Sequence, residues 1–167
     1  MKHTLILGLG NPLLGDEGIG VRVVEELQGL KLPEGVDVAE GGTAGLGLIG
    51  LMEGYQRVIV VDAADMGRPP GSVVRFTPAE VHLKTVETLL SPHQIGLGEV
   101  VTLADTLELA PDELVIIGVQ PKRVEMGTGL SPEVERAIPQ TIGLVLKELE
   151  RCLGSTLGNQ QEEDNHG

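Results

Sequence analysis

The side chains in this sequence that could bind a metal ion or transfer a proton at one site are Asp16, Glu17, Asp62 and His93. The two consecutive carboxylates lie in a glycine-rich stretch, residues 8–20, that follows an apolar run. A dinucleotide-binding fingerprint would have a third glycine where Leu13 stands, and a P-loop would have a lysine where Asp16 stands. Two carboxylates repel phosphate and attract a cation. The stretch therefore predicts a loop beside a metal ion, on a scaffold of the kind that usually binds nucleotides, with no bound nucleotide.

The elements that must position these side chains follow the pattern of a doubly wound α/β domain. Apolar runs of strand length occupy residues 4–9, 36–39, 57–61 and 113–119, and helical periodicity follows the first of them. A further strand is expected at residues 72–76. The connection between the third strand and this one is too short for a parallel crossover, so we expect it to be an antiparallel edge strand. The prediction is an α/β three-layer sandwich. Its five-stranded, mostly parallel twisted sheet has an order starting 2-1-3 and helices on both faces.

This topology brings the candidate side chains together. Ligands of such sheets bind at the carboxyl ends of the first and third strands, where Glu17 and Asp62 fall. His93 follows a Ser-Pro helix start, and a helix N-terminus disfavours the imidazolium, so His93 should stay neutral and able to bind metal. A glutamate, an aspartate and a histidine that converge with open coordination positions predict a catalytic-type metal site.

Each of these residues also has an ordinary structural role. Asp16 precedes a helix and suits an N-cap better than a metal ligand. Glu17 would be favoured in a first helical turn by the dipole alone. Asp62 could order a loop, and an isolated histidine such as His93 is usually a surface residue. The single residues are therefore ambiguous, and the prediction depends on their convergence.

Composition limits the classes of partner. The net charge of −13 argues against nucleic acids and anionic membranes, and no apolar run is long enough to span a bilayer. A lone cysteine, Cys152, permits no internal disulfide and suits a reducing cytoplasm. We expect a monomer with one domain over residues 1–153, a final helix from Ser131 to Leu153 interrupted near Pro139, and a disordered polar tail over 154–167.

The motifs resemble those of the hydrogenase maturation endopeptidases, which trim the carboxyl-terminal extension of the large subunit of nickel–iron hydrogenases after nickel insertion. The matching segments are Gly8-Leu-Gly-Asn-Pro-Leu-Leu-Gly-Asp-Glu-Gly-Ile-Gly-Val, Glu40-Gly-Gly-Thr-Ala-Gly, Val60-Val-Asp-Ala-Ala-Asp, Ser91-Pro-His93 and Gly118-Val-Gln-Pro. The resemblance implies that Glu17, Asp62 and His93 bind nickel carried by the substrate, which is the large-subunit precursor. The family usually has aspartate where this sequence has Glu40.

Other interpretations stay open at this stage. Asp16 and Glu40 are candidates for a carboxylate general base, as an alternative to a metal-assisted mechanism. The first strand with Gly10-Asn11-Pro12 is also similar to peptidyl-tRNA hydrolase, although the net charge of −13 opposes tRNA binding. A non-catalytic nickel-sensing or chaperone module on the same scaffold is the third interpretation.

Overall fold

A five-stranded sheet forms the centre of the computed structural model, which describes residues 3–43, 45–83 and 97–163. The strand order is β2-β1-β3-β5-β4. The strands are β1 (Thr4–Leu9), β2 (Val36–Gly42), β3 (Arg57–Ala63), β4 (Val73–Phe76) and β5 (Glu113–Val119). All neighbouring pairs are parallel except β4 and β5, which are antiparallel. The predicted 2-1-3 start and the antiparallel edge strand are both confirmed.

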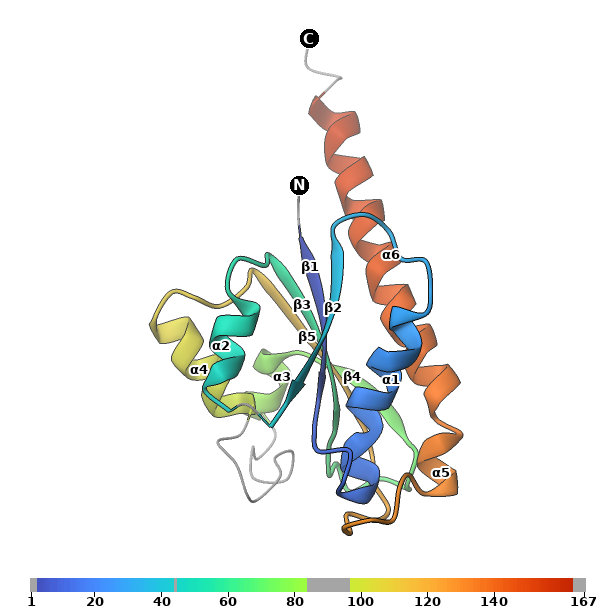
Figure 1. The fold of residues 1–167 in the computed structure, drawn as a ribbon. Helices are drawn as coiled ribbons and strands as arrows, with labels where there is room; N and C mark the ends of the chain where they lie inside the picture. Colours follow the sequence, from blue (N-terminus) through green and yellow to red (C-terminus); the bar gives the residue numbers. More distant parts are fainter. Residues whose placement is uncertain (1–2, 44, 84–96, 164–167) are drawn as a thin grey trace.

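Helices cover both faces of this sheet, which gives three layers (Figure 1). On one side lie α1 (Ile19–Gln28), α5 (Pro132–Glu135) and α6 (Ile138–Glu163). The other side carries α2 (Gly47–Met52), α3 (Pro78–Leu83) and α4 (Leu97–Thr106). A short 3-10 helix, η1 (Gly15–Gly18), precedes α1. In the described part of the chain, no helix has the length and apolar character needed to cross a membrane.

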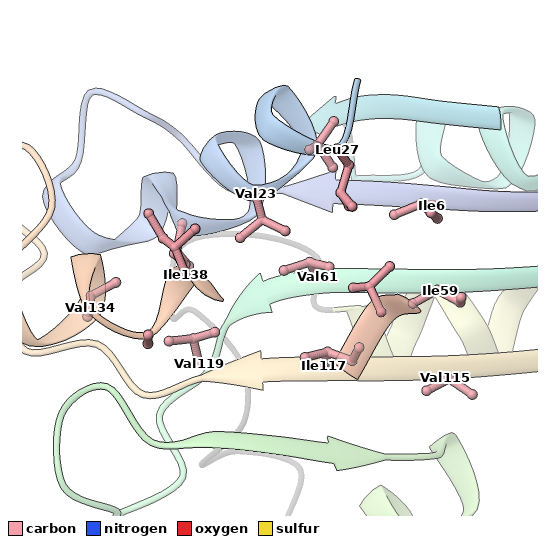
Figure 2. Close-up of a cluster of buried hydrophobic side chains, with 14 of the residues drawn as sticks. Ile6, Val23, Leu27, Ile59, Val61, Val115, Ile117, Val119, Val134 and Ile138 are labelled. Atoms are coloured by element: carbon pink, nitrogen blue, oxygen red, sulfur yellow. The ribbon is translucent and has the colours of Figure 1, made fainter. Parts of the chain in front are cut away.

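Alternation along the strands divides the core into two clusters, one on each face. Ile59 and Val61 of β3 pack toward α1 and α6, whereas Val58 and Val60 pack toward α2 and α4. Figure 2 shows the first cluster, in which α1, α5, β1, β3 and β5 all contribute aliphatic side chains. Both faces of the central strands are therefore buried, as their nearly all-apolar sequences predicted.

The last helix differs from the prediction at its carboxyl end. We expected it to stop at Leu153, with a disordered tail from Gly154, but α6 continues to Glu163. Its final turns extend beyond the sheet in Figure 1. Glycine weakens a helix without necessarily ending it, and no proline follows Gly154. The expected interruption near Pro139 is confirmed, because α5 ends at Glu135 and Pro139 lies in the first turn of α6.

A buried ion-pair cluster attaches α6 to the sheet. Glu148 of α6 is only 3% exposed, and its carboxylate pairs with Arg75 of β4. The guanidinium of Arg57 donates to the carbonyl of Glu148 at 3.1 Å and pairs with Glu113 at 2.9 Å. This cluster lies at the amino ends of β3 and β5, away from the predicted site.

Candidate functional site

The start of α1 rests directly on the carboxyl ends of β1 and β3. A Cβ on Gly20 would lie 2.3 Å from the carbonyl oxygen of Leu9 and 2.4 Å from that of Val61. Only glycine permits so close an approach. This contact places η1, and with it Asp16 and Glu17, at the end of the sheet where β3 delivers Asp62.

Glu17 and Asp62 lie close together at that end of the sheet. A Cβ built on Gly10 would contact the backbone carbonyl of Glu17 and would lie 3.7 Å from Oδ1 of Asp62. Both carboxylate residues are partly buried. Burial raises the pKa of Asp62 to about 7, the backbone N–H of Ala63 opposes the rise, and the negative charge of Glu17 adds to it. Two acidic groups held together in this way are suited to a cation.

Asp16 is fully buried and connects η1 to the segment 120–131 between β5 and α5. Its Oδ2 accepts hydrogen bonds from the backbone N–H groups of Lys122 (2.8 Å) and Arg123 (2.9 Å) and from the hydroxyl of Ser131 (2.8 Å). Its Oδ1 accepts from the backbone N–H of Ser131 at 2.6 Å. Burial alone would raise the pKa of Asp16, but these donors outweigh burial and lower it. The residue is thus an ionised brace between two loops.

The N-cap role expected for Asp16 is wrong. Asp16 lies inside η1, and the positions before η1 and α1 are Leu14 and Gly18, with no side-chain cap at either. The carboxylate accepts bonds from residues more than a hundred positions along the chain instead of from its own helix.

Glu40 lies on β2, level with Gly8 of β1 in the sheet register, and its side chain is exposed. Val36 and Val38 pack toward α1, so alternation places Glu40 on that same face. Asp62 alternates with Val58 and Val60 and belongs to the opposite face. The two carboxylates therefore lie at the same end of the sheet but on different faces.

Gln120 organises the loop that follows Asp62. Its Oε1 accepts from the backbone N–H of Met66 at 2.6 Å, and its Nε2 donates to Oδ1 of Asp65 at 3.2 Å. The side chain is buried, with 7% exposure. Since this loop follows directly on Ala63, the last residue of β3, Gln120 helps to hold the end of β3 and with it Asp62 in place.

The comparison with known proteins decides the family. The model of a family described as hydrogenase maturation protease matches residues 21–148. The chain belongs to this family. It is therefore a peptidase, and the tRNA-hydrolase and non-catalytic interpretations are set aside.

Individual relatives agree over nearly the whole chain. A hydrogenase expression/formation protein, HupD, from Bradyrhizobium diazoefficiens is 42% identical over 150 residues, which are 89% of this chain and 78% of HupD. The hydrogenase 2 maturation protease of Escherichia coli is 39% identical, over 88% of this chain and 90% of its own. The solved structure of the E. coli maturating endopeptidase HybD shares 36% identity with a TM-score of 0.77, covering 90% and 93% of the two chains.

The predicted metal ligands of this family member are only partly described. The structure brings Glu17 and Asp62 together, whereas His93 lies outside the described residues, so its place beside them stays a prediction. Among the residues whose side chains the structure describes, there is no group of three histidine, cysteine or acidic residues that could hold a metal ion.

The braces of the site were missed by the sequence analysis. The Gly118-Val-Gln-Pro segment was noted only for its resemblance, and Ser131 only as a helix start. Proline after Gln120 suggests a turn and proline after Ser131 a helix start, but no local pattern pairs these residues with Asp65 or Asp16. Those pairings exist only in the folded chain.

Proposed function

We propose that this peptidase removes the carboxyl-terminal extension from the large-subunit precursor of a nickel–iron hydrogenase, and that it recognises nickel already bound in the precursor. The observation that supports this most strongly is the convergence of Glu17 and Asp62 at the end of the sheet, in a chain of the maturation protease family. The metal is thus part of the substrate, and Glu17, Asp62 and His93 complete its coordination.

The two described ligands are suited to a cation that arrives with the substrate. A pKa of about 7 leaves Asp62 largely protonated below neutral pH, and a divalent cation would displace that proton. A bound cation would add to the stabilisation that the backbone N–H of Ala63 gives the anionic form. A coordinated metal supplies Lewis-acid polarisation and holds the scissile segment in place.

The two carboxylates predicted as general bases differ in their access to substrate. Both oxygens of Asp16 accept hydrogen bonds from backbone N–H groups or the Ser131 hydroxyl, which supports a bracing role. Glu40 is exposed on the opposite face of the sheet from Asp62. Of the two, Glu40 has the exposed carboxylate, and Glu40→Gln measures its contribution to the cleavage rate.

The decisive experiment is the mass of the precursor after incubation with purified protein. We expect the nickel-loaded precursor to be shortened and the nickel-free precursor to stay intact. Glu17→Gln, Asp62→Asn and His93→Ala should each abolish trimming, whereas Glu25→Gln, at an exposed position of α1, should not. Efficient trimming of nickel-free precursor, or by His93→Ala, would contradict nickel-dependent recognition.

A further inference from the structure

Three large apolar side chains stand exposed on two neighbouring loops beside Glu17. Leu13 is 66% exposed in the loop between β1 and η1. Val124 and Met126, at 48% and 77%, lie in the segment between β5 and α5. The backbone N–H of Gly127 donates to the carbonyl of Leu13 at 2.9 Å, so the two loops lie side by side. We call these three side chains the paired-loop patch.

The backbone under the patch is braced on both sides. Asp16 accepts from the N–H groups of Lys122 and Arg123, and its own N–H donates to the carbonyl of Arg123 at 2.8 Å. The N–H of Leu13 donates to Oδ1 of Asn11 at 2.9 Å. An exposed apolar group on a braced loop loses little further conformational freedom when a partner covers it. Clustered apolar side chains held in water in this manner mark a protein interaction site.

The patch is continuous with the predicted cleavage site. Asp16, which braces the patch, immediately precedes Glu17 in η1. A precursor whose metal is held by Glu17 and Asp62 therefore lies next to Leu13, and its surrounding surface is the nearest partner for the patch. Because the patch adjoins the predicted cleavage site, the precursor is the partner that we assign to it.

Charge at the edge of the patch defines one further feature of the partner surface. Lys122 and Arg123 are exposed next to the patch, in a chain with 25 acidic and 12 basic residues. Lys122 pairs with Glu133 at 2.8 Å, whereas the guanidinium of Arg123 has no ion pair within the part of the chain that the structure describes. Glu125, between Val124 and Met126, is exposed and adds a negative charge to the same segment. Arg123 is therefore the one cation in segment 122–126 without a described ion pair, and a complementary surface is apolar with a carboxylate opposite Arg123.

We propose that the paired-loop patch docks the folded body of the hydrogenase large-subunit precursor through an apolar surface that carries a carboxylate opposite Arg123. This contact is separate from coordination of the metal. The inference rests on the proposed function, because it takes its substrate from there.

The test compares Leu13→Asp, Met126→Asp and Arg123→Glu with a matched control, Leu30→Asp, whose side chain is 48% exposed beyond the far end of α1. Each protein is titrated against the nickel-loaded precursor, and KM, kcat and the affinity for the precursor are measured. We expect each patch variant to raise KM and weaken binding by about tenfold, as an interface residue does, with kcat changed less than about twofold. Leu30→Asp should match the wild type.

The results distinguish a failure of the docking inference from a failure of the proposed function. If the wild type does not trim the nickel-loaded precursor, the proposed function fails. If the wild type trims it and the patch variants keep the wild-type KM and affinity, the docking inference alone is wrong. The mass in solution is measured as well, since a wild-type dimer that Met126→Asp dissociates would assign the patch to a second copy of the chain and would also overturn docking of the precursor.

Discussion

Asp16 and Glu17 are consecutive carboxylates with different surroundings. Asp16 is fully buried and accepts four hydrogen bonds, whereas Glu17 is partly exposed near Asp62. Local sequence assigns both residues to the start of a helix, and their environments are set by which way each side chain faces. At the residue scale, burial decides which acid braces the loops and which lies partly exposed at the predicted metal site.

Replacing Asp16 should therefore cost more than the loss of a helix cap. Asp16→Ala leaves the N–H groups of Lys122, Arg123 and Ser131 without their acceptor, so we expect a loss of about 3 kcal/mol in the free energy of unfolding. Urea denaturation near neutral pH measures it, with Glu150→Ala, at an exposed position of α6, as the control. A loss of about 1 kcal/mol or less would contradict the bracing role of Asp16.

Asp62 should make stability fall as pH rises. Its pKa is about 7 in the folded protein and near 3.8 when unfolded, so between these values the folded state binds the extra proton. Raising the pH through this window removes that proton and destabilises the metal-free protein. Asp62→Asn cannot titrate, so we expect it to gain stability relative to wild type between about pH 5 and about pH 8.

Thermal unfolding in the presence of a chelator at both pH values checks this sign. The Asp16 carboxylate should contribute in the opposite direction, because its pKa is lowered and its stabilisation is lost only as the pH falls through that lowered value. A stability difference between Asp62→Asn and wild type that does not change with pH would show that Asp62 is not desolvated.

At the scale of elements, α6 is attached to the sheet by one buried acid. Glu148 is nearly inaccessible and contacts Arg75 and Arg57, which come from two different strands. Hydrophobic packing of Val145 and Leu149 supports the same helix. Glu148 therefore helps to fix the position of α6 relative to β3 and β4, and it also contributes to stability.

Glu148→Ala should be strongly destabilising. Removing Glu148 leaves the charge of Arg75 uncompensated and leaves the buried guanidinium of Arg57 paired with Glu113 alone, and we expect a loss of about 3 kcal/mol. Glu150→Ala on the same helix should change the free energy of unfolding by less than about 0.5 kcal/mol. Equal effects of the two substitutions in urea denaturation would contradict the assignment of a buried cluster.

At the scale of the whole molecule, the metal site is divided between enzyme and substrate in our proposal. Three protein ligands leave an incomplete coordination shell, so the isolated protein should bind Ni²⁺ only weakly. Adding Ni²⁺ to the enzyme beforehand should not allow it to trim a nickel-free precursor. Calorimetric titration with Ni²⁺, for wild type and Asp62→Asn, measures the first expectation. Tight binding that permits cleavage of nickel-free precursor would make nickel a cofactor of the enzyme.

The amino-acid sequence by itself determined the sheet and the approximate place of the site. Apolar runs set the bounds of β1 and β5, and the short connection after β3 required β4 to be antiparallel, because a parallel crossover needs more residues. The same topology brought Glu17 and Asp62 to one end of the sheet. Periodicity and connection length are local properties, so they can be read without coordinates.

Only the tertiary structure decided what surrounds those residues. The partners of Asp16 are Lys122, Arg123 and Ser131, and hydrogen bonds between distant loops leave no periodic trace in the sequence. Glu40 and Asp62 share one end of the sheet but lie on opposite faces, which depends on the registers of two strands. The burial of a side chain, its hydrogen-bond partners and the face of the sheet on which it lies depend on contacts between distant parts of the chain. These contacts form only when the elements pack together.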